Sequence, residues 1–304
     1  MAEDYPHTVL DLEKRFADEE ACRGYLFALR WPEGFVCPRC GQRRAWPMGR
    51  GLWLCGACRY QVSVTAGTIF HRSHKPLTTW FRVLWQVASQ KNGVSAMSLQ
   101  RALGLGGYQT AWTMLQKLRR AMVRPGRDRL RGSVDVDETY WGGAEPGVIG
   151  RLTHKKAIVI VAAEHDGAGI GRIRLGRIDD LTKASLHGFI AQAVEPGSTV
   201  TTDGLPAYLG LSEYTHDRQV QRRAGEGEHL LPRVHRVISL LKRWLLGTHQ
   251  GAVGQPHLDY YLDEFTFRFN RRKSASRGKL FYRLAQQAMQ VEPTPYKRLI
   301  HPKE

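Results

Sequence analysis

The chain has 304 residues, of which 42% are hydrophobic, so it can bury a core and is long enough for two or three domains. Its 45 lysines and arginines against 28 acidic residues give a formal net charge of +17, and an aromatic content of 10% argues against a disordered basic tail. The positive surplus favours a polyanionic partner, above all nucleic acid, although a ribosomal or membrane-surface protein would also be basic.

The first part of the chain predicts a helix and no targeting segment. Residues 1–30 are amphipathic, charged from Glu3 onward and without an apolar centre, and the lone Cys22 is interpreted as a small buried residue. The longest apolar run, at residues 157–163, is too short to cross a bilayer. We therefore expect a cytoplasmic protein with no membrane partner.

Four of the five cysteines form two CxxC pairs in residues 31–70, a region of short predicted strands and turns. Each tight pair can supply two thiolates to one tetrahedral zinc ion, and four thiolates leave no open position. The spacing thus predicts a zinc ribbon with structural zinc, against a redox dithiol or an iron–sulfur centre. The ligands would be Cys37, Cys40, Cys55 and Cys58. The ribbon is also basic, which suits contact with phosphates as well as a solvated surface, through Arg39, Arg43, Arg44 and Arg59.

Residues 71–125 are predicted to be helical, with two amphipathic segments joined by a glycine-rich turn. This layout is that of a helix-turn-helix, whose second helix, here at residues 108–122, enters the DNA major groove. Lys117, Arg119 and Arg120 would then be DNA-binding residues. An ordinary helical hairpin is an equally good interpretation of the same pattern.

After a basic linker, residues 130–290 show three strands, a helix, a fourth strand and further helices, followed by a tail at 291–304. This is the order of a ribonuclease-H-like α/β domain with a mixed sheet, so the chain is expected to be a multidomain α+β protein. Asp137 lies on the first strand and Asp203 ends the fourth, its neighbour in such a sheet. Two converging carboxylates in a basic protein suit a divalent ion such as Mg²⁺ bound together with substrate phosphates.

The helix that follows carries a polar face beside its apolar stripe. His235 and Lys242 lie on that face, seven residues and therefore roughly 10 Å apart along the axis. This arrangement suits a metal ligand at one end and a phosphate-binding cation at the other, although His235 alone is more simply a polar flank residue. Arg271 and Arg272 end the next helix, where they complement its dipole and are candidate DNA contacts.

Several long blocks, in this order, resemble bacterial insertion-sequence transposases of the zinc-ribbon type, the group catalogued as insertion-sequence family fifteen-ninety-five. The blocks are VDVDETYWGG, TTDGLPAY, HRVISLLKRWLLGTHQGAV and HLDYYLDEFTFRFNRR, and with the ribbon the resemblance covers about residues 15–290. It implies a ribonuclease-H-like core with a DDE-like acidic-triad site, in which the first catalytic aspartate falls on Asp137 and the second on Asp203. Asp135 is expected to have a supporting role, and Glu138 to point to the opposite face of the strand and not to bind the metal.

The third ligand is the point at which this sequence departs from the family pattern. Many such transposases place a glutamate seven residues before a helical lysine, and that position here is His235. Other members use a residue one turn later, which here would be Leu240 and cannot ligate. His235 is therefore the candidate, with Glu228 and Glu226 as alternatives, and an imidazole ligand suits Mn²⁺ better than Mg²⁺.

The resemblance implies a DNA transposase that binds the terminal inverted repeats of its element and catalyses metal-dependent strand cleavage and transfer to target DNA. It further implies structural Zn²⁺, catalytic Mg²⁺ or Mn²⁺, at least a dimer on double-stranded DNA, and association with the bacterial nucleoid. Two alternatives are a non-catalytic zinc-ribbon regulator derived from a transposase and a ribonuclease-H-like nuclease. The paired aspartates argue against the regulator, which has no use for them.

Overall fold

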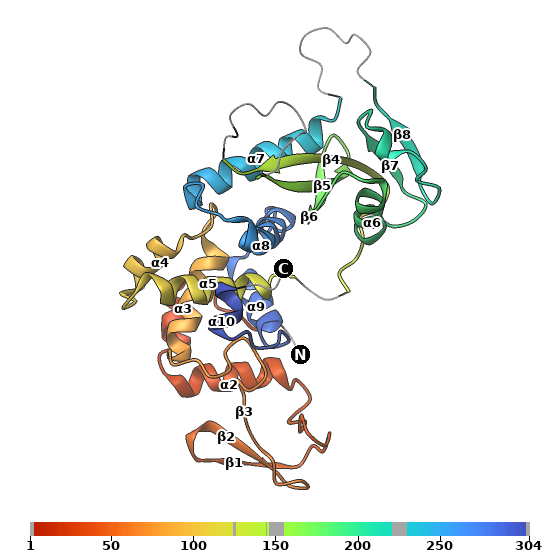
Figure 1. The fold of residues 1–304 in the computed structure, drawn as a ribbon. Helices are drawn as coiled ribbons and strands as arrows, with labels where there is room; N and C mark the ends of the chain where they lie inside the picture. Colours follow the sequence, from red (N-terminus) through yellow and green to blue (C-terminus); the bar gives the residue numbers. More distant parts are fainter. Residues whose placement is uncertain (1–2, 124–125, 144, 146–154, 221–229, 302–304) are drawn as a thin grey trace. The chain divides into compact units, whose positions relative to one another are not determined.

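The structure, a computed structural model, describes residues 3–123, 126–143, 145, 155–220 and 230–301 (Figure 1). The chain forms two compact units, of which unit 1 comprises Met1–Arg124 and Ser274–Lys303, and unit 2 comprises Pro125–Lys273. The predicted catalytic range, residues 130–290, is therefore too long at its C-terminal end, because the chain returns to unit 1 after Lys273. Within the described ranges no helix is long and apolar enough to cross a membrane.

Unit 1 combines helices with a small antiparallel sheet. The helices are α1 (Val9–Arg15), α2 (Glu19–Arg30), α3 (Leu77–Ser89), α4 (Ala96–Leu103), α5 (Tyr108–Arg120), α9 (Arg277–Ala288) and α10 (Tyr296–Ile300). The single N-terminal helix predicted for residues 1–30 is wrong, because the chain leaves α1 at Phe16 and starts again at Asp18, whose side chain accepts a hydrogen bond from the amide of Ala21 at 2.8 Å.

Aromatic side chains explain why α9 belongs to unit 1. The Phe281 ring of α9 lies 5.7 Å from that of Phe81 on α3 and 6.0 Å from that of Phe16, measured between centroids. Phe16 and Phe81 meet edge to face at 4.6 Å. Large rings buried in this way contribute strongly to a core, so residues far apart in the sequence share one unit.

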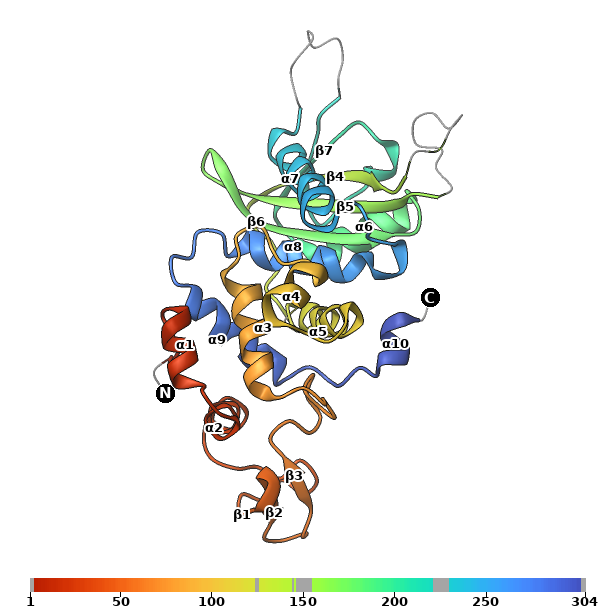
Figure 2. The same ribbon diagram turned by 90° about the vertical axis from the view of Figure 1, so that its left-hand side faces the viewer.

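The small sheet of unit 1 has the order β1-β2-β3, with β1 (Ala45–Met48), β2 (Leu52–Cys55) and β3 (Gln61–Ser63), and a 3-10 turn η1 (Gly49–Gly51) joins the first two. Trp53 on β2 packs against Phe27 of α2 and Phe35, at centroid distances of 4.6 and 6.1 Å. One face of this sheet is thereby attached to α2, next to which the strands lie in both views (Figure 1; Figure 2).

Unit 2 is built on a five-stranded mixed sheet of the order β6-β5-β4-β7-β8. Its elements are β4 (Ser133–Trp141), β5 (Ala157–Asp166), β6 (Gly169–Ile178), α6 (Lys183–Ala193), β7 (Thr199–Thr202), η2 (Pro206–Tyr208), β8 (Thr215–Arg218), α7 (Pro232–His249), η3 (Gln255–His257) and α8 (Leu258–Asn270). The strands β4, β5 and β6 are antiparallel, whereas β7 and β8 run parallel to β4. This order and these directions are those of a ribonuclease-H-like sheet, which confirms the predicted fold class. The edge strand β8 escaped prediction because its sequence, THDR, is polar and mostly exposed.

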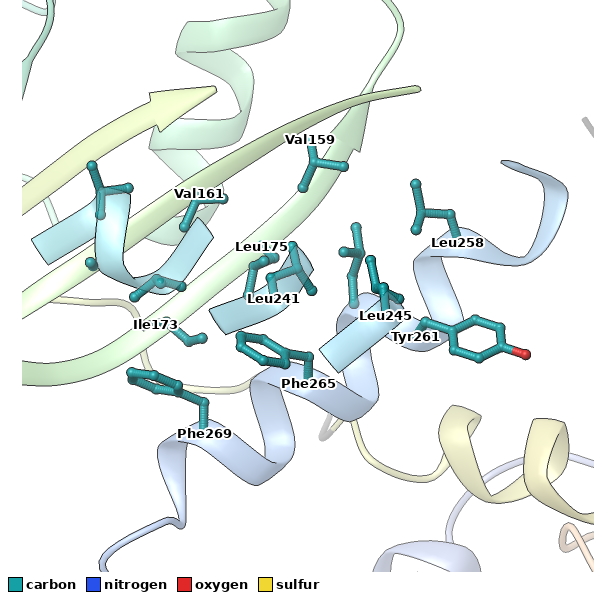
Figure 3. Close-up of a cluster of buried hydrophobic side chains, with 14 of the residues drawn as sticks. Val159, Val161, Ile173, Leu175, Leu241, Leu245, Leu258, Tyr261, Phe265 and Phe269 are labelled. Atoms are coloured by element: carbon teal, nitrogen blue, oxygen red, sulfur yellow. The ribbon is translucent and has the colours of Figure 1, made fainter. Parts of the chain in front are cut away.

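Side-chain alternation along β4 decides where the aspartates point. Val134 and Val136 are buried in the cluster with Leu186 and Ile190 of α6, on one face of the sheet. The opposite face packs on α7 and α8, where the sheet residues Val159, Val161 and Leu175 lie close to helix residues such as Leu241 and Phe265 (Figure 3). Because successive strand residues face opposite sides, Asp135 and Asp137 point to the side of α7.

An ion pair at the β5–β6 hairpin gives unit 2 a measurable acid sensitivity. Burial alone would raise the pKa of Glu164, but hydrogen bonds from the Arg172 side chain and from the amides of Arg131 and Arg172 outweigh it and hold the pKa at about 2. A depressed carboxyl pKa stabilises the fold above its unfolded value of about 4.3, and that stabilisation is lost as the pH falls towards the folded value. We expect Glu164→Gln to lower the free energy of unfolding by about 1–2 kcal/mol at pH 7, allowing for solvent screening.

Urea denaturation at pH 7 and at pH values down to 2.5 measures this contribution. The difference between wild type and Glu164→Gln should shrink steadily below about pH 4. A difference that stays constant over the whole range would show that the charge of Glu164 has no part in stability.

Candidate active site and zinc centre

An acidic cluster lies at the end of the parallel strand pair β4 and β7. The register places Val136 opposite Thr202, so Asp137 and Asp203 are the next residues along the two neighbouring strands. One carboxylate oxygen from each of Asp137, Glu138 and Asp203 lies within 4.8 Å of the other two. The structure therefore brings together the two aspartates that the sequence pointed to, and it adds a third carboxylate.

Glu138 corrects one expectation from the sequence. Its side chain does lie on the face opposite to Asp137, where its Oε2 accepts a hydrogen bond from the hydroxyl of Tyr208 at 3.0 Å. It nevertheless joins the cluster, because Asp203 follows the last residue of β7 and so lies beyond the paired part of the strands. Alternation along a strand therefore does not exclude a side chain from a site at the strand end.

His235, in the first turn of α7, lies against the same aspartate. Its Nε2 is 3.0 Å from Oδ2 of Asp137, while Oδ1 of Asp137 accepts a hydrogen bond from the amide of Glu138 at 2.9 Å. The side chain of Asp137 is 13% exposed and that of His235 is 43% exposed. Lys242 is half-buried two turns further along α7. The alternatives Glu226 and Glu228 lie outside the described residues.

The electrostatics of the cluster suit a cation. Burial raises the pKa of Asp137, and the nearby charge of Asp203 adds to this increase, although the Glu138 amide and His235 oppose it. Carboxylates that converge in this way repel one another when ionised, and a hard divalent ion with oxygen ligands removes that repulsion. The spacing of 3.0 Å between His235 Nε2 and Asp137 Oδ2 also matches two adjacent ligands of one octahedral ion, which would lie about 3 Å apart. The donor set therefore fits Mg²⁺ or Mn²⁺.

Asp135 has a different partner from Asp137, although the two share a face of β4. Its side chain is 4% exposed, and its Oδ1 lies 2.6 Å from Nε2 of His165 on β5. Asp135 and His165 thus form a separate pair further back along the strand.

The four paired cysteines converge next to the end of β2. One Sγ pair, Cys37 and Cys58, is 3.7 Å apart, and the other, Cys40 and Cys55, is 3.6 Å apart. A disulfide requires about 2.05 Å, whereas thiolates at about 2.3 Å from a tetrahedral zinc ion lie about 3.8 Å from each other. Hydrogen bonds from the amides of Cys58 and Ala57 lower the pKa of the Cys55 thiol to about 6, which favours the thiolate that zinc needs. The site therefore fits zinc.

The two helices predicted around the glycine-rich turn are present as α4 and α5, but one of the candidate DNA-binding residues, Arg119, is buried. Arg119 is only 1% exposed, because it follows Leu115 by four residues and lies on the buried stripe of α5. Lys117 and Arg120 are half-buried, and burial lowers the pKa of Lys117. The more exposed residues of α5 lie in its N-terminal half, where Tyr108 is 50% exposed.

Arg271 and Arg272 bind the C-terminal end of α8. Arg271 donates to the carbonyl of Phe267 at 3.3 Å, and Arg272 donates to the carbonyls of Phe269 at 2.9 Å and Gly171 at 3.1 Å. The bonds to Phe267 and Phe269 reach carbonyls in the last turn of the helix, the bond to Gly171 joins Arg272 to β6, and the positive charges favour the C-terminus of the helix. The two arginines thus have structural partners, as the dipole interpretation expects, while Arg272 remains exposed.

Comparison with known families identifies two segments of the chain. Residues 129–270 match the family model of the ISXO2-like transposase domain, and residues 17–61 match that of the transposase zinc-ribbon domain, both of family IS1595. No curated protein matches the chain. Among solved structures, the Mos1 strand transfer complex is similar at a TM-score of 0.28 and 14% identity, over 69% of this chain and 75% of that one, a likeness too distant to carry an argument. With ribbon and catalytic domain matched in that order, the chain belongs to the zinc-ribbon, ISXO2-like transposases.

Proposed function

We propose that this transposase binds the terminal inverted repeats of its own insertion sequence, cleaves a DNA strand at the element end and joins it to target DNA. The observation that carries the proposal is the convergence of Asp137, Glu138 and Asp203 within 4.8 Å. It lies at the end of the parallel strands of a ribonuclease-H-like sheet, in a chain of net charge +17. Such a cluster can approach DNA phosphates only when cations neutralise it, which favours metal-dependent phosphoryl transfer.

Asp137 and Asp203 would hold the catalytic Mg²⁺ or Mn²⁺, with His235 as the third ligand. When bound, two such ions stabilise the attacking and the leaving oxygen of a phosphodiester. The hydrogen bond from the Glu138 amide orients the Asp137 carboxylate. Lys242, roughly 10 Å along α7 from His235, would bind a phosphate of the same DNA strand.

Glu138 is the alternative third ligand. It offers the oxygen that Mg²⁺ prefers, but its Oε2 already accepts the hydrogen bond from Tyr208, a side chain that is fully buried. The Nε2 of His235 lies 3.0 Å from Oδ2 of Asp137 and the side chain is partly exposed, so it can approach an ion from the side of α7. We therefore favour His235 and give Glu138 the role of a neighbouring carboxylate held by Tyr208.

The partners follow from this activity. Double-stranded DNA would contact α5 through its exposed N-terminal half and Lys117, and the exposed Arg272 would contact it at the end of α8. Joining both ends of an element to one target requires two active sites, so the protein would act as at least a dimer on DNA. The zinc ion would be structural, and the protein would work in the cytoplasm, at the nucleoid.

The sharpest test supplies full-length protein with labelled duplexes that carry the terminal repeats flanking its gene, together with a target plasmid. With Mg²⁺ or Mn²⁺ we expect strand cleavage at the repeat end and covalent joining to the plasmid, and neither product when the divalent ions are omitted. Cleavage without joining would favour the ribonuclease-H-like nuclease. Specific binding with no cleavage in either metal would favour the non-catalytic regulator.

A further inference from the structure

The zinc ribbon has an exposed surface of arginine and aromatic side chains that the proposed catalytic site does not use. We call it the ribbon surface, and it consists of Arg39, Arg43, Arg44, Trp46, Met48, Arg50, Arg59 and Tyr60. All of these residues are exposed, with Trp46 and Met48 at 41% and Tyr60 at 38%. Large apolar side chains left open next to cations mark a binding surface.

The strand register shows that Trp46 and Met48 do not belong to the ribbon core. The inner face of the sheet carries Trp53, which packs on Phe27 of α2. Trp46 lies opposite Leu54, and Met48 lies opposite Leu52, so all four are one residue out of step with Trp53 and point to the other face. The ribbon therefore presents one face to α2 and an apolar face to its surroundings.

Arginines accompany the exposed rings. The guanidinium of Arg44 lies 5.1 Å from the ring centroid of Trp46, and that of Arg39 lies 6.0 Å from that of Tyr60. Residues 31–63 hold five arginines and a single acidic residue, Glu33, which pairs with Arg43 at 3.4 Å. The ribbon surface is thus strongly positive and presents aromatic rings next to guanidinium groups.

Two of the arginines occupy backbone positions that suit glycine. The residue after each cysteine pair has a left-handed backbone conformation. After Cys40 this residue is Gly41, with a φ of 74°, whereas after Cys58 it is Arg59, with a φ of 58°. Arg50, at the tip of the β1–β2 turn, has a φ of 62°. A side chain at such a φ is strained relative to glycine. Arginine at these two positions therefore favours a binding role for the Arg59 and Arg50 side chains rather than a structural one.

We propose that the ribbon surface binds single-stranded DNA, with unpaired bases stacked on Trp46 and Tyr60 and phosphates bound by the surrounding arginines. Stacking on an exposed ring requires a base whose face is free, which a duplex does not offer, whereas arginines alone would suffice for a duplex backbone. The inference rests on the proposed function only for the source of the DNA, because strand cleavage and joining expose unpaired strands at the element ends.

The test measures binding of the zinc-loaded full-length protein by fluorescence anisotropy, without Mg²⁺ or Mn²⁺ so that no strand is cut. The probes are a labelled 20-nucleotide single strand of mixed sequence and the same sequence as a duplex. We expect Trp46→Ala and Tyr60→Ala each to weaken single-strand binding by about 5- to 100-fold and duplex binding less than twofold. Trp46→Phe should retain most of the affinity, and the matched control Tyr296→Ala, an equally exposed tyrosine at 36%, should bind like wild type.

Arg59→Gly separates a binding role from a structural one. Glycine relieves the strain at this left-handed position, as Gly41 does in the other cysteine pair, so the variant should retain zinc at least as well as wild type. Its single-strand affinity should nevertheless fall several-fold, and more at low salt than at high salt, because a phosphate contact is lost.

Unchanged single-strand affinity of Trp46→Ala and Tyr60→Ala, with full zinc content, would overturn the proposal. So would an equal loss of duplex affinity, which would assign the surface to double-stranded DNA. The assay requires no catalysis, and its outcome is independent of the cleavage test. A protein that binds single strands through Trp46 and Tyr60 but never cuts would sustain this inference and refute the proposed transposition chemistry.

Discussion

Asp137→Asn and Asp203→Asn should each reduce strand cleavage at the element end by more than about a hundredfold. Loss of an outer-shell partner of a metal ligand typically costs about 10- to 100-fold, and loss of a ligand's charge should exceed that. The asparagine preserves size and hydrogen bonding at both positions. Because burial raises the pKa of Asp137, its charged form destabilises the metal-free fold, so the Tm of metal-free Asp137→Asn should not fall.

Cleavage rates and duplex binding are measured on the same preparations, so that a loss of catalysis can be told from a loss of DNA affinity. Duplex affinity without divalent ions should stay within about twofold of wild type, because the site binds DNA phosphates through cations. Asp135→Asn changes the same residue type on the same strand face but in the pair with His165, and it should reduce cleavage less than the other two variants, because Asp135 has only a supporting role. Normal cleavage by Asp137→Asn and Asp203→Asn would refute the site.

Two further variants identify the third ligand. His235→Ala should lower cleavage about as much as Asp137→Asn if His235 binds the ion, and Glu138→Gln should then lower it far less. The reverse order would assign the third position to Glu138. Glu138→Gln keeps an acceptor for the Tyr208 hydroxyl, so its effect reports the lost charge rather than a broken contact.

Removal of zinc should unfold the ribbon. Its strands have only four, four and three residues, and one face of the sheet is largely open, so apolar burial alone cannot hold it. Structural zinc supplies about 10–16 kcal/mol of apparent binding energy to small zinc-dependent folds at pH 7. We expect Cys55→Ser to lose the bound zinc and to become sensitive to proteolysis within residues 31–63.

Zinc content by atomic emission and peptide mapping after limited proteolysis check this result. Cys22→Ala is the matched control, because Cys22 is the cysteine outside the cluster, lies buried in α2, and should leave one zinc ion per chain. Retention of zinc and protease resistance by Cys55→Ser would contradict a four-thiolate site. The same variant should also lose single-strand binding, since the ribbon surface requires the folded ribbon.

Local patterns in the sequence were sufficient to predict the site residues where the chemistry depends on residues close together in the chain. The cysteine pairs predict four thiolates because a CxxC turn brings two sulfurs together in any fold. The order of strands and helices, with Asp137 on a strand and Asp203 after a β-branched run, predicts a ribonuclease-H-like sheet in which the two meet. Local spacing along α7 likewise placed His235 and Lys242 on one helix face.

Tertiary structure decided what depends on neighbours that are distant in the chain. Glu138 joins the acidic cluster because β4 pairs with β7 and Asp203 lies beyond that pairing. Arg119 is buried although its charge marks it as a surface residue. Packing of Phe281 against Phe16 and Phe81 assigns α9 to unit 1, against the continuous domain that the sequence suggested. Residue type and spacing therefore determined which groups can do the chemistry, whereas long-range strand pairing and core packing determined which of them meet, because those contacts depend on the whole fold.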